Sequence, residues 1–240
     1  MANQPRVLLT RPEEDIERDK KIFLSLGIEV IPLPLIGFRP LDFKIPPLGG
    51  FDYIYFGSKR AVDFFLSKVK KLPSHLRVLV VGKKTANHLR EKYSVEPFLV
   101  AKGSSKLLYE EIKNKNLPPG KVLVPTAKVH SKGIYLLERL GFELHIVPVY
   151  ETVFLRYPQE EIKAKLAKAD ILIFTSPSTF LALLANLQLE QLFSLIKGKK
   201  IVAIGETTKK AIEDKGLKVD WVPSEPSMEL IAKEIKKWIT

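Results

Sequence analysis

YIYFGSKRAV, residues 53–62, and ILIFTSPSTF, residues 171–180, share one pattern. Each opens with four apolar residues and passes through a serine, Ser58 or Ser176, into a segment of helical period. Strands without polar alternation are buried on both faces, as in a parallel sheet covered by helices. The two stretches therefore predict an α/β protein in which helices begin directly after buried strands.

The same alternation of short apolar runs and helical segments continues along the 240 residues. Further strands are predicted at residues 7–10, 30–35, 78–81, 122–124, 144–150, 201–204 and 219–222. Helices are predicted at residues 14–26, 60–69, 84–92, 106–113, 134–140, 179–187, 208–215 and 228–238.

The chain also repeats itself weakly, at a spacing of roughly 114 to 123 residues. VLLT at residues 7–10 compares with VLVP at 122–125, and LGIEV at 26–30 with LGFEL at 140–144. The serines of the opening stretches align with each other, and VGKKT at 81–85 aligns with IGETT at 204–208. We expect two similar α/β units.

Two proline-rich extended segments indicate how these units are connected. They lie at residues 32–40 and 148–152. Proline is tolerated on edge strands and not in central ones. Both segments are therefore interpreted as edge strands that run side by side between two domains, with the second domain inserted into the first.

Composition excludes several classes of protein. There is no cysteine, which excludes a disulfide framework, a thiolate metal site and a cysteine nucleophile. Lysine and arginine number 39 against 27 acidic residues, a net charge of +12 that suggests an anionic partner. Lysines outnumber arginines about 30 to 9, whereas bidentate recognition of phosphates or bases favours arginine. Abundant Lys and Glu with few Cys and Met is also typical of heat-adapted proteins.

The usual catalytic constellations are missing from the sequence. No two of its four histidines stand at metal-ligand spacing with a carboxylate, and His75 and His88 are interpreted as surface or packing residues. GKKT at residues 82–85 resembles the end of a phosphate-binding loop, but the earlier glycine position holds Arg77. The longest apolar stretch, residues 171–187, is interrupted and too short for a membrane span, so we expect a cytoplasmic protein.

Hydroxyl residues recur where predicted helices begin. Each could be a simple helix cap, and Thr10 stands at capping-box spacing from Glu13. Together they have a further consequence, because helix starts meet at the carboxyl edge of a parallel sheet and bind anions there. These starts lie at Thr10, Ser58, Thr85, Ser104-Ser105, Ser176, Ser178, Thr208, Ser224 and Ser227.

Taken in order, these motifs resemble the uroporphyrinogen-III synthase family. The matching pieces are LLTRP (8–12), FGSKRAV (56–62), VGKKTA (81–86), VYET (149–152), IFTSPS (173–178) and AIGETT (203–208). They extend over nearly the whole chain. The resemblance implies two parallel-sheet α/β domains joined by a two-stranded linker. The outer, flavodoxin-like domain is expected at residues 1–37 and 151–240, the inserted domain at 41–147, and the linker at 38–40 and 148–150.

The resemblance also implies an activity. It is the cyclisation of the linear tetrapyrrole hydroxymethylbilane to uroporphyrinogen III, with loss of water and inversion of ring D, in an inter-domain cleft. The implied enzyme is a lyase of porphyrin and heme biosynthesis that needs no metal or organic cofactor. It is expected to be a monomer, with transient contacts to neighbouring enzymes of the pathway. Its task is to fold a polycarboxylate substrate correctly.

The resemblance carries roles to particular residues. Tyr150 is the candidate for assisting departure of the hydroxyl group, although a purely structural role at the domain junction remains the alternative. The candidate substrate-binding residues are Thr10, Arg11, Ser58, Arg60, Thr85, Ser176, Ser178, Lys200 and Thr208. Arg11 could equally pair with Glu13 or Asp15. Glu206 departs from the family pattern by placing a negative charge near an anion site.

Two other functions compete with this reading. The net charge would suit a nucleic-acid-binding α/β protein, although no basic block with interleaved aromatics is present. A two-domain ligand sensor is the other alternative.

Overall fold

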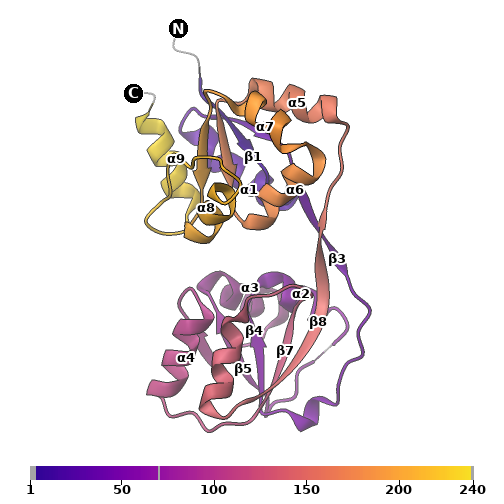
Figure 1. The fold of residues 1–240 in the computed structure, drawn as a ribbon. Coiled ribbons are helices and arrows are strands. Elements are labelled where there is room, and N and C mark those ends of the chain that lie inside the picture. Colours follow the sequence, from indigo (N-terminus) through magenta and orange to yellow (C-terminus); the bar gives the residue numbers. More distant parts are fainter. Residues whose placement is uncertain (1–3, 70, 239–240) are drawn as a thin grey trace. The chain divides into compact units, whose positions relative to one another are not determined.

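The computed structural model describes residues 4–69 and 71–238. The chain divides into two compact units (Figure 1). Unit 1 comprises Met1–Gly37 with Val153–Thr240, and unit 2 comprises Phe38–Thr152. The chain passes between them along two strands that neighbour each other in one sheet, β3 (Ile36–Pro40) and β8 (Glu143–Phe154). The domain bounds expected from the sequence and the linker role of residues 38–40 and 148–150 stay predictions.

Unit 1 is built on a parallel sheet of order β10-β9-β1-β2. Its strands are β1 (Arg6–Leu9), β2 (Glu29–Pro32), β9 (Ile171–Phe174) and β10 (Lys200–Ala203). Beyond β10, a single parallel bridge joins Val202 to Trp221, so the strand predicted at residues 219–222 is reduced to that bridge. With the bridge in fifth place, the order matches the flavodoxin-like 2-1-3-4-5 arrangement.

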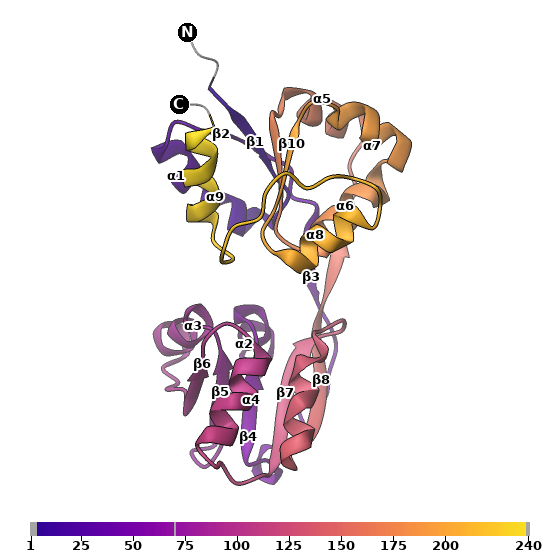
Figure 2. The same cartoon turned by 60° about the vertical axis from the view of Figure 1, so that its left-hand side comes forward.

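Helices cover both faces of this sheet (Figure 2). On one face, Val7, Leu9 and Ile173 pack with α1 (Glu13–Ser25) and α9 (Met228–Lys237). The remaining helices of the unit are α5 (Gln159–Lys168), α6 (Pro177–Asn186), α7 (Leu189–Ile196) and α8 (Glu206–Glu213). Because helices cover the sheet on both sides, the apolar side chains on both faces of each strand are removed from water, which explains the continuous apolar sequences.

Unit 2 contains a six-stranded sheet of order β3-β8-β7-β4-β5-β6, parallel from β8 to β6. Besides β3 and β8, its strands are β7 (Lys121–Ala127), β4 (Tyr53–Phe56), β5 (Arg77–Val81) and the edge strand β6 (Leu99–Ala101). Its helices are α2 (Lys59–Leu66), α3 (Lys83–Tyr93) and α4 (Ser105–Asn114), with the 3-10 turns η1 (Leu48–Gly50) and η2 (Lys132–Leu140). The segment predicted as an α-helix at 134–140 is therefore a 3-10 helix. The predicted α/β class with parallel sheets is confirmed.

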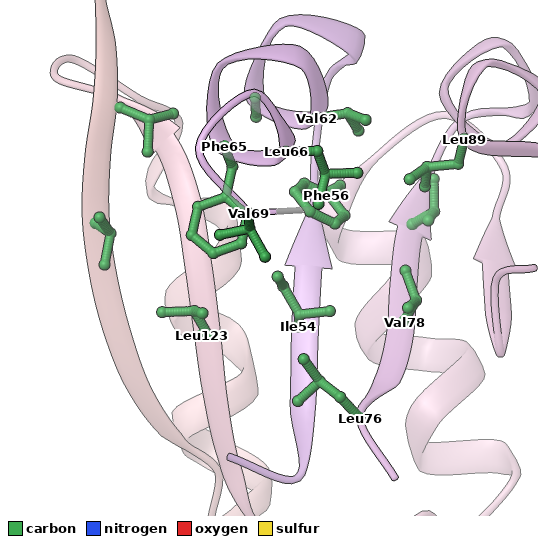
Figure 3. Close-up of a cluster of buried hydrophobic side chains, with 14 of the residues drawn as sticks. Ile54, Phe56, Val62, Phe65, Leu66, Val69, Leu76, Val78, Leu89 and Leu123 are labelled. Carbon is green, nitrogen blue, oxygen red and sulfur yellow. The ribbon is translucent and has the colours of Figure 1, made fainter. Parts of the chain in front are cut away.

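Alternate residues of β4 face opposite layers of unit 2. Ile54 and Phe56 pack beneath α2 and α3, where Phe65 of α2 fills the space over the strand (Figure 3). Tyr53 and Tyr55 join the cluster under α4 and η2. This two-residue period places Tyr55 on the α4 side of the sheet.

The two copies of the sequence repeat do not form one unit each: each unit contains strands from both copies. The repeat aligns β1 with β7, β2 with β8, β9 with β4 and β10 with β5. Under that correspondence the order β2-β1-β9-β10 in unit 1 becomes β8-β7-β4-β5, which is the order found in unit 2. Each sheet thus takes one strand pair from each half of the chain, so the two units share a core topology while one is inserted in the other.

Within residues 4–69 and 71–238, no single helix is long and apolar enough to cross a membrane. The pair α6 and α7 reaches the required length and composition only when joined across a bend of 105°.

The α2–sheet core generates a stability prediction. Phe65 is fully buried. Truncation of a buried Phe to Ala typically costs about 3–5 kcal/mol, because apolar burial is lost and a cavity is left. We expect Phe65→Ala to lower the free energy of unfolding, measured by urea denaturation, by about that amount. Phe98, which is 51% exposed in the same unit, provides the matched control. Equal losses for Phe65→Ala and Phe98→Ala would contradict the packing described.

Candidate functional site

A pocket of about 420 Å³ opens in unit 2 at the carboxyl ends of the parallel strands. It lies where the order of the strands reverses, since the chain runs from β4 toward β5 and β6 on one side, whereas β7 and β8 lie on the other. Open α/β sheets bind their ligands at such reversal points. The lining residues that carry hydroxyl groups are Tyr55, Ser58, Ser104, Ser105, Thr126, Ser131 and Tyr150.

Three helical segments begin at this pocket, each with a serine as its cap. Ser58 Oγ accepts a hydrogen bond from the Ala61 amide at 3.1 Å and caps α2. In the same way, Ser104 accepts from Leu107 N at 3.3 Å, and Ser131 accepts from Gly133 N at 3.2 Å. An accepting serine oxygen still has its hydrogen to donate. The pocket therefore presents O–H donors beside the positive ends of helical segments, an arrangement that favours anions.

The lining is polar but bears no fixed charge. Among the described residues around the pocket, none is Asp, Glu, Lys or Arg, and His130 is the one imidazole. His130 Nδ1 lies 3.1 Å from the Ala127 carbonyl oxygen, and Nε2 lies 3.4 Å from the Tyr135 hydroxyl. Next to this histidine, Val129 is 89% exposed at the edge of the pocket. The site thus combines hydroxyl donors with apolar surface.

Tyr55 forms one wall of the pocket and depends on its neighbours. Its hydroxyl lies 3.0 Å from Ser105 Oγ. Burial raises the pKa of Tyr55, and the bond to Ser105 opposes this only in part. At Gly57 an added Cβ would meet the Tyr55 hydroxyl at 2.8 Å, which explains the absence of a side chain there. Burial therefore favours the neutral phenol, while Gly57 leaves room for the hydroxyl and Ser105 bonds to it in the wall.

Tyr150 lies in the same pocket, near the middle of β8, and is 8% exposed. Its hydroxyl is 3.4 Å from Ser58 Oγ, so the predicted catalytic residue and one predicted binding residue come together. Arg60, also predicted to bind substrate, stacks its guanidinium carbon 3.9 Å above the Phe38 ring. Thr85 is buried at the start of α3 and does not line the pocket.

The other predicted residues belong to unit 1. Ser176 caps α6, its Oγ accepting from Thr179 N at 3.3 Å, and Ser178 follows in the first turn. Thr208 is buried at the start of α8, as Thr85 is in α3. Lys200 lies at the opposite, amino-terminal end of β10 and pairs with Asp220 at 3.2 Å. The structure thus places Ser176, Ser178 and Thr208 at helix starts and Lys200 away from them.

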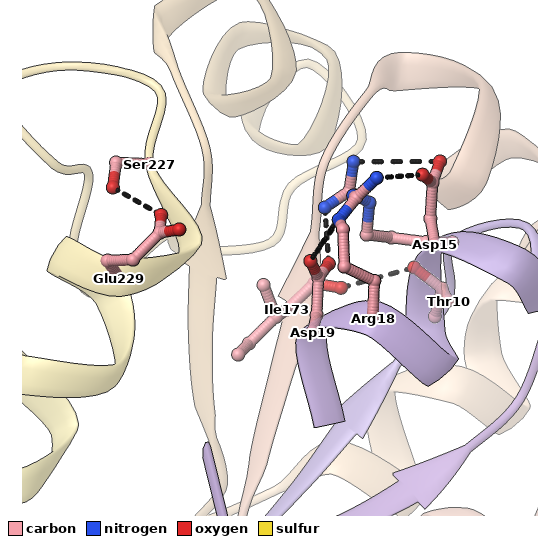
Figure 4. Close-up of polar contacts among 8 residues, drawn as sticks. Thr10, Asp15, Arg18, Asp19, Ile173, Ser227 and Glu229 are labelled. Atoms are coloured by element: carbon pink, nitrogen blue, oxygen red, sulfur yellow. Dashed lines mark hydrogen bonds and ion pairs between the residues drawn. The ribbon is translucent and has the colours of Figure 1, made fainter. Parts of the chain in front are cut away.

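Thr10 and Arg11 follow β1 and form contacts within unit 1. Figure 4 shows Thr10 beside Ile173, and Arg18 beside Asp15 and Asp19. Thr10 is fully buried and donates to the Ile173 carbonyl at 3.1 Å. The predicted capping box with Glu13 is wrong, because Pro12 occupies the cap position of α1. Arg11 forms ion pairs with Asp15, at 3.7 Å, and with the buried Asp19. Two carboxylates therefore balance the charge of Arg11, so the pairing alternative for this residue is the one observed.

Several lining residues were not predicted as site residues. Ser104 and Ser105 were recognised only as a helix start. Tyr55 reads as a core position of a strand, and Thr126 and Ser131 carry no local signal beyond their polarity. His130 has no partner motif nearby in the sequence. Only the helix-start pattern could have found any of them. No group of three or more His, Asp or Glu suited to a metal ion occurs in the part of the chain that the structure describes.

A family model for the uroporphyrinogen-III synthase HemD matches residues 17–233 of this chain. The chain belongs to the uroporphyrinogen-III synthase family. The resemblance read from the motifs is confirmed, and the matches give no support to the nucleic-acid-binding alternative.

Relatives of this family match most of the chain. The uroporphyrinogen-III synthase of Chlorobaculum parvum is 29% identical over 244 residues, covering 90% of this chain and 92% of that protein. The structure of uroporphyrinogen-III synthetase from Helicobacter pylori matches with a TM-score of 0.68 and 21% identity, over 99% of this chain and 100% of that one. The structure of a mutant uroporphyrinogen III synthase from Thermus thermophilus matches with a TM-score of 0.62 and 19% identity, over 97% of this chain and 98% of that one. At these identities the structural likeness supports the fold.

The ion pairs of Arg11 generate a second prediction. Asp19 has a side chain only 2% exposed and pairs with both Arg11 and Arg18. Both arginines keep Asp15 as a partner when Asp19 is removed, so the loss is that of hydrogen bonds to a charged group, about 1.5–3 kcal/mol. We expect Asp19→Ala to lower the free energy of unfolding in urea by about that amount. Glu160→Ala, which removes an exposed partner of Lys163, should change it by less than about 1 kcal/mol. Equal effects would show that the Asp19 pairs are not buried as described.

Proposed function

We propose that this chain catalyses the cyclisation of hydroxymethylbilane to uroporphyrinogen III, with loss of water and inversion of ring D. The observation that carries the proposal is the family match over residues 17–233. The hydroxyl-lined pocket of unit 2 supports it, because a polycarboxylate requires many hydrogen-bond donors. The cyclising lyase reading therefore fits both the family and the chemistry of the pocket.

Carboxylates of the bilane are bound by neutral donors in this proposal. The Oγ atoms of Ser58, Ser104 and Ser131 accept hydrogen bonds from backbone amides at helix starts. In this proposal their hydroxyl hydrogens are donated to the carboxylates of the substrate. The partial positive charge of a helix start adds about 0.3–1 kcal/mol to each anion contact. In unit 1, Ser176, Ser178 and Thr208 stand at equivalent helix starts, and we propose that they bind further carboxylates. Lys200 and Arg11 are paired with aspartates and are weaker candidates.

The reaction needs a proton for the departing hydroxyl group. Breaking the carbon–oxygen bond releases water once that oxygen is protonated, and leaves an azafulvene-like cation. The substituted carbon of ring D attacks this cation to give a spiro intermediate, which fragments and recloses through the free carbon of ring D, so that the ring is inverted. That carbon then loses its hydrogen as a proton, which balances the proton consumed in releasing water. We propose that the Tyr150 hydroxyl, next to Ser58, donates a hydrogen bond to the departing oxygen. Positioning of the chain of rings accounts for the isomer formed.

The described residues that line the pocket bear no fixed charge, which suits a cationic intermediate. A carboxylate wall would repel the substrate, and an ammonium group would oppose the cation. Hydroxyl groups avoid both, since a hydroxyl oxygen can accept while its hydrogen donates. Tyr55, whose pKa is raised by burial, stays neutral in the wall. We further propose that the enzyme works as a cytoplasmic monomer, since a chain without cysteine needs no oxidising compartment.

The activity is tested by supplying hydroxymethylbilane and separating the oxidised porphyrin isomers. Unassisted closure gives isomer I, so enrichment of isomer III in proportion to protein concentration is the expected result. An unchanged isomer I product would refute the proposed function.

The proposed role of the Tyr150 hydroxyl can be tested by removing that oxygen alone. If its hydroxyl assists departure of the leaving group, Tyr150→Phe should lower kcat by on the order of 10²-fold, the lower range for acid catalysis. Its melting temperature should fall by no more than a few degrees, about the loss of one hydrogen bond. Tyr157→Phe, which removes a 2.7 Å bond to the Pro34 carbonyl in unit 1, is the matched control and should keep its activity. Full activity of Tyr150→Phe would reduce Tyr150 to a packing role.

A further inference from the structure

The Tyr150 ring is held from several sides within unit 2. Phe64 stacks on it, with ring centroids 5.2 Å apart and planes 20° from parallel. Phe38 meets it edge-on at 5.7 Å and 79°. The hydroxyl lies 3.4 Å from Ser58 Oγ. These contacts define both the plane of the ring and the direction of its O–H group.

One helix provides most of these contacts. Ser58 caps α2, and Phe64 lies six residues later on the same helix. Arg60, between them, covers the Phe38 ring at 3.9 Å. A rotation or shift of α2 would therefore move the stacking ring and the hydroxyl partner of Tyr150 together, and would disturb the ring that meets it edge-on.

The orientation of α2 is set by two further attachments. Its Val62 and Phe65 are buried over the sheet (Figure 3). Asp63 connects it to α3, where three groups donate to a single carboxylate oxygen. These are His88 Nε2 at 2.8 Å, Lys92 Nζ at 2.8 Å and Tyr93 OH at 2.6 Å.

The electrostatics of Asp63 agree with this role. Partial burial acts to raise the pKa of Asp63, but the hydrogen bonds from Lys92, Tyr93 and His88 outweigh it and hold the pKa below its ordinary value. The ionised carboxylate is thus the form that joins the two helices. Hydrogen bonds to a charged group are about twice as strong as neutral ones, so one side chain anchors α2 through three of them.

We infer that α2 is the element that orients Tyr150, with Phe64 and Asp63 as positioning residues. This rests on the proposed function for its catalytic consequence, but its geometric content stands apart from it. Phe64 fixes the plane of the ring, and Asp63 keeps α2 in the rotation that brings Phe64 and Ser58 to Tyr150. Phe64 and Asp63 are assigned no contact with substrate.

Phe64 is tested by a set of three variants. In Phe64→Leu the stacking partner is lost, and kcat should fall about tenfold with KM changed less than twofold, because small misplacements of a reacting group are costly. Phe64→Tyr keeps the ring that stacks on Tyr150 and should retain the wild-type kcat, since Phe64 is only partly buried and leaves room for a hydroxyl group at the surface. Phe43→Leu removes an aromatic ring that stacks on Phe65, 6.0 Å away, and should leave kcat unchanged. An unchanged kcat in Phe64→Leu, or an equal loss in Phe43→Leu, would overturn the inference.

Asp63 is tested by removing its charge. Asp63→Asn should lower kcat severalfold with little change in KM, whereas Asp42→Asn, which loses a fully exposed partner of Lys68, should not. A lowered pKa stabilises the fold above the ordinary pKa of 3.8, and this stability is lost as pH falls through the folded value. The difference in melting temperature between wild type and Asp63→Asn should therefore shrink as pH falls below about 4. A difference independent of pH would argue against the charged anchor.

A spectroscopic measurement separates this inference from the proposed function. The chain has seven tyrosines, so ring-labelled tyrosine gives an NMR spectrum in which Tyr150→Phe identifies the Tyr150 signal. Stacking on Phe64 should displace that signal, and the displacement should vanish in Phe64→Leu but persist in Phe64→Tyr and Phe43→Leu. This outcome is expected even if no isomer III is formed. An unshifted Tyr150 signal in the wild-type protein would overturn the inference whether or not the enzyme is active.

Discussion

Parallel pairing of β4 with β5 on one side and β7 on the other is the constraint on which the pocket of unit 2 depends. Because all three strands run the same way, the segments that follow them start at one edge of the sheet. The strand order reverses beside β4, so α2 and η2 cover opposite faces of the sheet and a space remains between their starts. Ser58 and Ser131 reach the pocket for this reason.

Because each unit contains strands from both copies of the repeat, the two sheets share one strand order and are covered by helices in the same way. A continuous apolar strand must be covered on both faces, and a strand–helix–strand unit covers only one. Each sheet is completed by a pair of strands from the other half of the chain. Equivalent helix starts, such as those at Ser58 and Ser176, consequently recur in both units. The repeat therefore explains why hydroxyl caps are so frequent in the chain.

The net charge of the chain is not concentrated in the described lining of the unit 2 pocket. The net charge of +12 suggests an anionic ligand, yet the described lining of the pocket contains hydroxyl groups and no lysine or arginine. Arg11, which follows the first strand, is balanced by Asp15 and Asp19. In the proposed function, net charge at a distance steers a polycarboxylate, and neutral donors at helix starts are the groups proposed to bind it without opposing a cationic intermediate.

Local features could be predicted from the sequence alone. The bounds of the strands Tyr53–Phe56 and Ile171–Phe174 agree with the apolar runs, because burial on both faces leaves a direct mark in the residues. Ser58, Ser104, Ser176 and Ser227 cap helices as expected, since a cap bonds to an amide three residues away. The family followed from the order of such short motifs.

Tertiary structure decided which of these features meet. Sequence spacing reports the period of an element and not its neighbour in a sheet, so the exchange of strand pairs determined that Ser58 joins Ser104 and Tyr150. Tyr55 has the sequence context of a core residue, and only the packing around β4 makes it part of the pocket wall. Lys200 stands at the other end of its strand because strand direction is a property of the sheet. Ser58, Ser104, Ser176 and Ser227 lie at helix starts as the short-range pattern predicts, whereas Thr10 does not cap α1. The pocket itself is a product of long-range packing.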